Sequence, residues 1–392
     1  MPPLPHDGAM SLRIAVLGLG AWGDTLAGLL RQQGHQIQGW SRRQGGDPAA
    51  VLNGADVALV AVSMAGVREL APRLAPHWPA GLPLISCSKG IDLEALCTPS
   101  QLWRQHAPAL PLLVLSGPNL ASELAAGLPA ASVLAGVDAD LARRLQHALS
   151  SERLRLYTNA DPIGTEVAGA LKNVMAIAAG VCDGLQLGAN AKASLLCRAL
   201  VEMGTVIQAL GGAPASLYGL AGLGDLLATA NSPLSRNYRF GLGLAEGLSR
   251  PEALSRVGAT VEGAGTTDAV LRLAEQHGWH LPICSEVAAL MAGRSSASAA
   301  VRRLMERDLR EEPGPAFGAP PGGECIFCVF RAGGIEPGGG VAEGLAGVVG
   351  EVPGQFALPP LAGTPLGPPA ATWVPLAALR PLTGSPWGPF GR

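Results

Sequence analysis

Lysine is scarce in this chain. Of its 28 basic residues only Lys89, Lys172 and Lys192 are lysines, and the others are all arginines. A compositional bias toward arginine explains the scarcity by itself. Arginine nevertheless keeps its proton near neutral pH, whereas a buried lysine can release one. Each of the three lysines is therefore a candidate for a specific task.

An excess of charge of either sign is also lacking. Charged residues make up 15% of the chain and the formal net charge is −2, so bulk charge indicates neither a nucleic-acid partner nor a membrane surface. No uninterrupted apolar stretch approaches the ~20 residues that span a bilayer. Residues 1–10 lack the basic and apolar regions of a signal peptide. We expect a cytoplasmic protein without stable membrane association.

Cysteines are few and odd in number. Seven of them, scattered over 392 residues, do not make a disulfide framework. Cys325 and Cys328 have a C-x-x-C spacing, but no second pair accompanies them for zinc and no βαβ pattern surrounds them for redox chemistry. We expect no metal.

A glycine-rich turn near the start is the strongest motif present. Residues 12–17 form an apolar run typical of a buried parallel strand, and a helical pattern follows. Between them Gly18, Gly20 and Gly23 have the G-x-G-x-x-G order, in which the glycines allow a tight turn, the approach of a pyrophosphate and close helix packing. An ordinary glycine-rich βα turn is the alternative. The context favours a dinucleotide site.

Further apolar runs predict the rest of a sheet. Strands are expected at residues 35–40, 55–62, 82–86, 111–115, 131–135 and 154–157, with helices between most of them. This alternation predicts a doubly wound, Rossmann-like α/β domain. Ligands of such sheets lie beyond the carboxyl ends of the strands, where Ser63, Lys89 and Asn119 fall.

The second strand ends in a basic pair. Arg42 and Arg43 stand where a NAD-specific fold usually has an acidic residue for the ribose 2′-hydroxyl. Because an arginine accommodates a 2′-phosphate, the pair favours NADP over NAD. A solvated turn is the alternative interpretation.

Composition divides the chain into four parts. We predict a disordered leader at 1–10, with Met10 a second possible start, a dinucleotide-binding domain at 11–160 and an all-helical substrate and subunit-contact domain at 161–311. Helices are expected there at 163–186, 193–210, 268–277, 283–293 and 297–309. Residues 312–392 are rich in glycine and proline, which predicts a disordered tail or an out-of-frame extension.

Two stretches of the helical part carry polar groups that a simple core would exclude. Lys172 and Asn173 interrupt an apolar helix, where the lysine either reaches the surface or stays desolvated with a lowered pKa, ready for proton exchange. Asp225 lies in a glycine-rich apolar run and can position that lysine. Arg236 and Asn237 follow in what reads as a polar loop, and Arg236 suits a phosphate.

Taken together, these stretches resemble one family. GLGAWGDTLA, SKG, SGPNLASELAAGLPAA, ALKNVMAIAAGVCDGLQLGANAKA, GLAGLGDLLAT and SRNYRFG, in this order, closely resemble the bacterial NAD(P)-dependent glycerol-3-phosphate dehydrogenases over about residues 11–310. The resemblance implies reversible reduction of dihydroxyacetone phosphate to sn-glycerol 3-phosphate for phospholipid synthesis. It also implies NAD or NADP as cofactor, a small phosphorylated substrate and a homodimer.

The resemblance assigns roles residue by residue. Lys172 matches the proton donor to the substrate C2 oxygen, with Asp225 beside it as a second catalytic residue. The implied substrate-binding residues are Lys89, Asn173, Thr229, Arg236 and Asn237. The implied cofactor-binding residues are Gly18, Gly20, Ala21, Trp22, Gly23, Arg42, Arg43, Lys89 and Glu262.

Some positions depart from the family pattern. The segment between Arg43 and Asp56 is short, which trims the second βα unit. Asp24 replaces a threonine at the start of the phosphate-binding helix, where an inward carboxylate would crowd a pyrophosphate. Ser122 stands where some relatives have a lysine. A sister β-hydroxyacid or sugar-acid dehydrogenase and a non-catalytic NADP(H)-binding protein remain as alternatives, and Arg236 with Lys172 and Asp225 argues against both.

Overall fold

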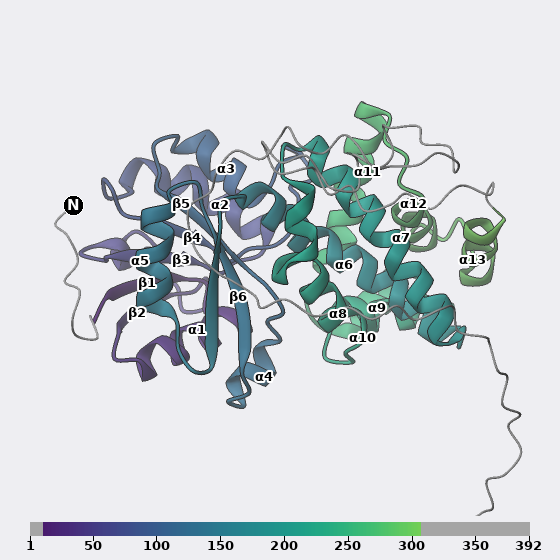
Figure 1. Ribbon diagram of the computed structural model, residues 1–392, viewed down its shortest axis with the longest axis horizontal. Helices are drawn as coiled ribbons and strands as arrows, with labels where there is room; N and C mark the ends of the chain where they lie inside the picture. The colour runs from purple at the N-terminus through teal and green to yellow at the C-terminus, as the bar shows by residue number, and fades with distance from the viewer. Residues whose placement is uncertain (1–10, 307–392) are drawn as a thin grey trace, which may run out of the picture. The chain divides into compact units, whose positions relative to one another are not determined.

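The computed structural model describes residues 11–306. The predicted leader, the predicted tail and the C-x-x-C pair at 325–328 lie outside the described residues. Within that range the strands belong to the purple and blue part of the ribbon, and the teal and green part is helical (Figure 1).

One seven-stranded sheet contains all the predicted strands. They are β1 Arg13–Leu17, β2 Gln36–Trp40, β3 Val57–Val60, β4 Leu84–Ser86, β5 Leu112–Ser116, β6 Ala130–Ala135 and β7 Leu154–Asn159. Their order is β2-β1-β3-β4-β5-β6-β7, and every neighbouring pair is parallel except β5 and β6. The doubly wound class is confirmed. β2 lies on one side of β1, and β3 and the later strands lie on the other side. Such sheets bind ligands at this switch point between β1 and β3.

Helices cover both faces of the sheet because successive strand residues point to opposite sides. Ile14 and Val16 pack with α1 (Ala21–Gln32) and α5 (Ala139–Leu149), whereas Ala15 and Leu17 pack with α2 (Met64–Leu74) and α3 (Pro99–His106). The short α4 (Ala121–Ala125) precedes β6. The two faces therefore have separate apolar cores, which explains why β1 and β3 read as continuous apolar runs.

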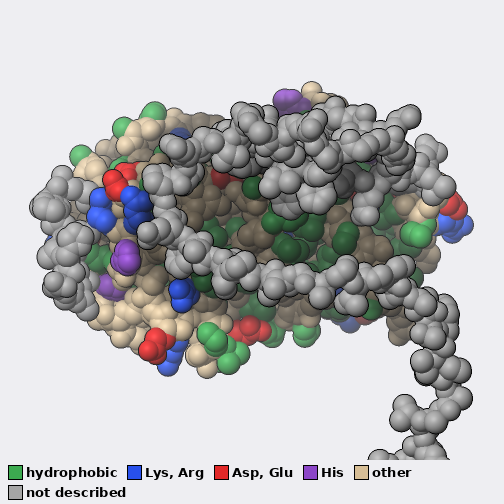
Figure 2. All heavy atoms as spheres, viewed as in Figure 1, with side chains coloured by type: hydrophobic (Ala, Val, Ile, Leu, Met, Phe, Trp, Pro, Cys, Tyr) green, Lys and Arg blue, Asp and Glu red, His purple; other side chains and the backbone are tan. Residues whose placement is uncertain are grey.

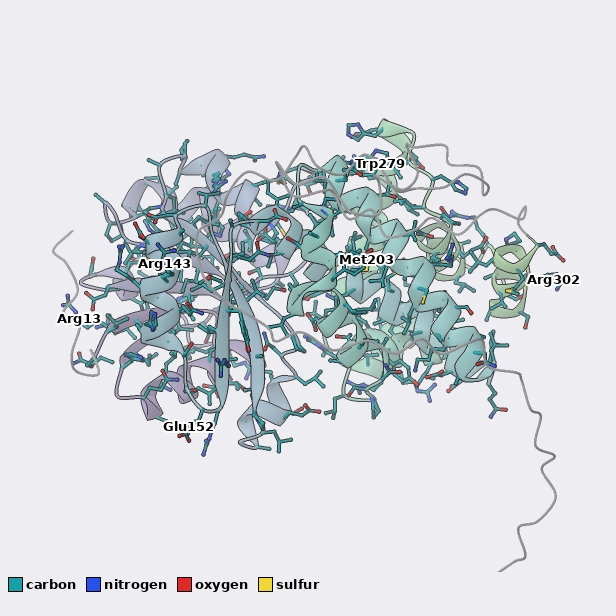
Figure 3. All side chains as sticks on the ribbon, in the orientation of Figure 1. Arg13, Arg143, Glu152, Met203, Trp279 and Arg302 are labelled. Atoms are coloured by element: carbon teal, nitrogen blue, oxygen red, sulfur yellow. The ribbon has the colours of Figure 1, made fainter. Side chains whose placement is uncertain are left out.

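The helical part is built around α6 (Pro162–Gly184). It is the one helix of residues 11–306 that is long and apolar enough to span a bilayer, but 89% of its most apolar 18-residue stretch is buried inside the protein. The helix also carries the charged residues Glu166 and Lys172, and both are buried. We therefore interpret α6 as a core helix. In Figure 3 the labelled Met203 of α7 lies among the side chains of this helical part, whereas Arg302 lies at its margin.

Other helices surround α6. They are α7 Gly188–Ala209, α8 Asp225–Ala230, α9 Arg236–Ala245, α10 Arg250–Val257, α11 Glu262–His277, α12 Pro282–Met291 and α13 Ala297–Met305, with short turns η3 Pro214–Tyr218 and η4 Leu220–Gly224. Helices were predicted at the positions of α6, α7 and α11–α13. Helices α8–α10 were missed, because each is short, α9 contains two glycines and α10 has a proline in its first turn.

The crossing of α6 and α9 depends on two glycines. A Cβ added to Gly180 would lie 2.1 Å from the Tyr238 carbonyl oxygen, and one added to Gly241 would lie 2.1 Å from the Ile177 carbonyl oxygen. Both distances are far below van der Waals contact, so the two backbones touch directly. The crossing places the start of α9 beside the middle of α6.

We predict that Gly241→Ala destabilises the protein by about 1–3 kcal/mol, because the new methyl group forces α9 away from α6. Gly28→Ala is the matched control. Gly28 lies in α1 with open space around its Cβ position, so alanine there is expected to stabilise the helix by about 0.5–1 kcal/mol. Urea unfolding followed by circular dichroism measures both. Equal stability of the two variants would contradict the close crossing.

Candidate active site

The glycine-rich turn joins β1 to α1 and has the geometry expected of a dinucleotide site. Gly18 has φ +105°, and a Cβ there would lie 2.6 Å from the Ala61 carbonyl oxygen. A Cβ on Gly23 would lie 1.8 Å from the Gly18 carbonyl oxygen, so Gly23 allows α1 to pack against the turn. Gly20 instead faces open space, with nothing within 4 Å of its Cβ position. A phosphate can therefore approach the backbone at Gly20.

The start of α1 offers donors to that phosphate. No side chain caps the helix at Gly20, so the amides of its first turn, Ala21 to Gly23, face the turn without a side-chain acceptor. Unpaired amides and the positive end of a helix dipole together attract phosphate. Ala21 is exposed and Trp22 is half-buried. Asp24 is exposed in the same turn, and its amide donates to the Gly20 carbonyl oxygen at 2.8 Å.

Arg42 and Arg43 lie in the turn after β2 and both are exposed. Arg42 contacts Glu69 of α2, with 3.5 Å between the guanidinium and carboxylate, across a solvated surface. The trimmed segment that follows contains a short helical turn at Ala50–Leu52, and the buried Leu52 fills the space beside the sheet. Both guanidinium groups therefore lie at the solvent-exposed end of β2.

The central feature of the site is a carboxylate shared by two lysines. Lys172 Nζ donates to Asp225 Oδ1 at 2.9 Å, and Lys89 Nζ donates to Asp225 Oδ2 at 2.5 Å. Lys172 also donates to Thr229 Oγ1 at 2.6 Å. Lys172 and Asp225 are 7% and 2% exposed. The prediction had placed Asp225 beside Lys172; the structure shows that Lys89 shares the same carboxylate.

Three separate segments deliver these groups. Lys172 lies in the middle of α6, and Asp225 begins α8 after the turn η4, which is tightly wound against η3 because Gly222 lacks a side chain. Lys89 follows β4 and also donates to the Gly117 carbonyl oxygen, 3.4 Å away, beyond the end of β5. The pairing therefore joins the sheet to the helical part of the chain.

Burial and charge set the proton affinities of the three groups. Burial, assisted by the nearby Lys89, lowers the pKa of Lys172 to about 8, although Asp225 opposes the shift. Burial alone would raise the pKa of Asp225, but Lys172 and Lys89 outweigh it and the net shift is downward. Near neutral pH the site holds an ionised carboxylate and a lysine ammonium poised to release its proton.

Hydrogen-bonded asparagine side chains extend from the position next to Lys172 toward α9 and α11. Asn237 Nδ2 donates to Asn173 Oδ1 at 2.8 Å, and Asn173 Nδ2 lies 3.4 Å from Glu262 Oε2. The Gly263 amide donates to Asn237 Oδ1 at 2.9 Å. Burial raises the pKa of Glu262 even though Arg236, Lys89 and Lys172 act to lower it. The predicted residues Asn173, Asn237 and Glu262 are thus brought together beside the lysines.

The prediction of a polar loop at Arg236 and Asn237 is wrong. Ser235 caps α9 by accepting from the Tyr238 amide at 3.2 Å, and Arg236 and Asn237 are the first helical residues. Ser235 as a candidate N-cap residue was the signal available in the sequence. Arg236 is exposed, whereas Asn237 is buried. Backbone amides at the helix start and the guanidinium of Arg236 are therefore both hydrogen-bond donors at this position.

Two other expected positions have structural partners. Ser63 caps α2 by accepting from the Gly66 amide at 3.4 Å, and Asn119 Oδ1 accepts from Ser132 Oγ at 2.7 Å. Ser122 is exposed in α4. Among residues 11–306, no group of three or more His, Cys, Asp or Glu side chains is arranged to hold a metal ion.

Sequence reasoning overlooked the task of the third lysine and one buried acid. Lys192 Nζ donates to Asp183 Oδ2 at 2.6 Å, and Tyr238 of α9 donates to the same oxygen at 2.7 Å. Glu166 of α6 is 1% exposed and contacts β4 and α3. A charged residue in a mostly apolar stretch was the sequence signal for Glu166, and the scarcity of lysine was the signal for Lys192.

A dinucleotide turn at a switch point of a doubly wound sheet, together with a buried lysine held by an aspartate, defines the class of nicotinamide-dinucleotide-dependent dehydrogenases. Comparison with known proteins narrows the class. The profile of the NAD-dependent glycerol-3-phosphate dehydrogenase N-terminus matches residues 13–46 and 44–142, and that of the C-terminus matches 161–302. The chain belongs to this family.

Individual relatives agree. Glycerol-3-phosphate dehydrogenase (NAD(P)+) of Synechococcus sp. (strain RCC307) is 57% identical over 303 residues, which cover 77% of this chain and 100% of the relative. That of Synechococcus elongatus (strain ATCC 33912 / PCC 7942 / FACHB-805) is 48% identical over 76% of this chain and 97% of its own. The crystal structure of the Coxiella burnetii glycerol-3-phosphate dehydrogenase has a TM-score of 0.73 at 34% identity, covering 76% of this chain and 99% of that one.

We predict that Asp225→Asn destabilises the protein by about 3–5 kcal/mol, because it leaves the buried ammonium of Lys172 and the partly buried ammonium of Lys89 without their anion. The variant also loses the charge that raises the pKa of Lys172, so that pKa falls further below its unfolded value. The unfolded variant then binds more protons than the folded variant, so the stability of the variant rises with pH. Its deficit in free energy of unfolding relative to wild type therefore shrinks as the pH rises from mildly acidic toward about 8.

Urea unfolding of wild type and variant at several pH values measures this deficit. Asp183→Asn is the matched control, because its lysine pair is more exposed, with side-chain exposures of 14% for Lys192 and 29% for Asp183. A smaller loss is expected there. A deficit at Asp225 that grows with pH would contradict the proton balance described above.

Proposed function

We propose that this chain interconverts dihydroxyacetone phosphate and sn-glycerol 3-phosphate with NADH or NADPH. The observation that carries the proposal is the buried ammonium of Lys172, fixed by Asp225 and Thr229 at 2.9 and 2.6 Å and lowered in pKa to about 8. A general acid and base with a pKa near the working pH is what reversible carbonyl reduction needs. The bound nicotinamide supplies or accepts the hydride.

Each side chain of the site has a distinct task in this mechanism. Lys172 donates a proton to the carbonyl oxygen of the substrate during reduction and takes it back during oxidation. Asp225 and Thr229 hold its Nζ in one direction, which fixes the geometry of proton transfer. Lys89 presents a second positive charge beside the developing oxyanion, where a preorganised cation stabilises the transition state.

A phosphorylated substrate suits the start of α9. Arg236 is exposed there and provides a planar guanidinium, while the helix start adds backbone donors and a positive dipole end. Asn173, which follows Lys172 on α6, is hydrogen-bonded to Asn237, which follows Arg236 on α9. This arrangement favours a short phosphorylated ketone over an unphosphorylated hydroxyacid, because a doubly charged phosphate gains more from a guanidinium at a helix start than a singly charged carboxylate does.

We predict that wild type oxidises NADH or NADPH with dihydroxyacetone phosphate, and that Lys172→Ala lowers kcat by about 10²–10⁴-fold through loss of the general acid. Lys172→Arg is the control, because it keeps the charge but cannot release the proton. The kcat for reduction is expected to fall as the pH rises through about 8, and the kcat for oxidation to rise. No turnover with either cofactor, or an active Lys172→Arg, would refute the proposal.

The preference for NADP is a further part of the proposal. Arg42 and Arg43 are exposed at the end of β2, and no described contact of theirs is buried enough to withhold them from a 2′-phosphate. We predict that Arg42→Ala with Arg43→Ala raises KM for NADPH far more than KM for NADH. The matched control is Arg143→Ala with Arg144→Ala, two exposed arginines of α5. Equal changes for both cofactors would exclude the preference.

We also propose a cytoplasmic homodimer that supplies glycerol phosphate for phospholipids. Hydrophobic side chains gather over the helical part on the face shown in Figure 2, where charged side chains are sparse. Leu187 and Val201, at the start and outer face of α7, are 39% and 44% exposed. An apolar helical surface of this kind supports a subunit contact.

A further inference from the structure

Glu166 is a buried carboxylate at the junction of α6 with the sheet. Its Oε1 accepts from the Ser100 amide at 3.0 Å and from Ser86 Oγ at 3.3 Å, and its Oε2 accepts from Ser100 Oγ at 2.6 Å. The residue is 1% exposed. Burial raises the pKa of Glu166, and the donors on Ser100 and Ser86 oppose that rise. One side chain therefore ties α6 to both β4 and α3.

The partners of Glu166 belong to the segments that carry the two active-site lysines. Ser86 ends β4 and directly precedes the segment 87–89 that contains Lys89. Glu166 lies on the same helix as Lys172, toward its start. The hydrogen bond between Glu166 and Ser86 thus connects α6, which carries Lys172, to the strand that leads to Lys89. Both lysines contact Asp225.

α6 also packs closely against the sheet at Gly169, which lies between Glu166 and Lys172 on the helix. A Cβ on Gly169 would lie 2.6 Å from Ser116 Oγ and 3.7 Å from the Lys89 Cε atom. The Lys89 side chain therefore passes directly over α6. A small displacement of α6 from β4 changes the distance from Lys89 to Asp225 more than the distance from Lys172 to Asp225, because Lys172, Asp225 and Thr229 all belong to the helical part.

A purely structural task is the alternative, and the chain contains an example of it. Glu202 of α7 is also buried, and its carboxylate accepts from the amides of Ile283 and Cys284 at 2.6 and 3.2 Å, at the start of α12. Glu166 likewise accepts from an amide in the first turn of α3. The difference is that Glu202 joins two helices of the helical part, whereas Glu166 joins α6 to the strand that leads to Lys89.

We propose that Glu166 is a positioning residue for the reaction: through Ser86 and Ser100 it fixes α6 against β4 so that Lys89 and Lys172 share Asp225. The inference rests on the proposed function and deepens it. Loss of the tie lets Lys89 withdraw and admits water beside Lys172. The groups that face Lys172 are then Asp225 and Glu262, with Lys89 more distant.

The test compares Glu166→Ala, Glu166→Gln and Glu202→Ala in kcat, KM, pH profile and melting temperature. Glu166→Ala is expected to lower kcat by roughly 10- to 100-fold, the usual effect of a misplacement of about 1 Å. Its KM for the dinucleotide is expected to stay within about twofold of wild type, because the glycine turn is untouched. The fall of kcat for reduction should move to higher pH, because Lys172 loses both burial and the repulsion from Lys89.

Glu166→Gln retains an acceptor for Ser100 and Ser86 and is expected to keep most of kcat and the wild-type pH profile. Glu202→Ala is expected to lower the melting temperature without changing either. If Glu166→Ala does not fold, Ser86→Ala with Ser100→Ala removes the hydroxyl ties without removing the buried carboxylate, and the same shifts of smaller size are expected.

Wild-type turnover is measured first, so that failure of the proposed function is distinguished from failure of this inference. An active wild type whose Glu166→Ala variant, or serine double variant, melts earlier but keeps the wild-type kcat and pH profile would overturn the positioning task. A Glu166→Gln variant as impaired as Glu166→Ala would overturn it too, since the charge and not the tie would then matter.

Discussion

The structure depends on one buried carboxylate that faces two ammonium groups. Asp225 is 2% exposed and bonds to Lys172 and Lys89 on its two oxygens. Burying charges is costly unless geometry and hydrogen bonding compensate, so this cluster tolerates little displacement of any member. Burial, with a smaller contribution from the second ammonium of Lys89, lowers the pKa of Lys172 to about 8, although Asp225 opposes the shift. The sheet and the helical part are thereby joined at the proposed catalytic site.

That geometry requires backbones to approach more closely than side chains allow. Gly169 lets α6 pass Ser116, and Gly222 winds η4 tightly enough to place Asp225 at the start of α8. Gly263 allows the start of α11 to reach the Asn173 carbonyl oxygen, where a Cβ would lie 2.6 Å away. The glycines of the helical part therefore do for the substrate end of the site what Gly18 and Gly23 do for the dinucleotide turn.

Local patterns predicted the elements, but not their long-range pairing. The strands and the glycine turn were found from apolar runs and residue order, since β1, β3 and β5 are buried on both faces. The antiparallel pairing of β5 with β6 leaves no mark in either strand's composition. Arg236 was assigned to a loop because its helix is short and rich in glycine. The contact of Lys89 with Asp225 joins residues 136 positions apart, and no local pattern records it.

Scarcity of lysine alone does not separate a catalytic lysine from a structural one. All three lysines bond to an aspartate, and Lys192, with Asp183 and Tyr238, forms as complete a cluster as Lys172 does. The two clusters differ in the balance of charge. Asp183 receives one ammonium and one phenol, whereas Asp225 receives two ammonium groups in a more buried setting. Burial and, to a smaller extent, the second cation Lys89 lower the pKa of Lys172 to about 8, and Lys192 has no second cation among its described contacts.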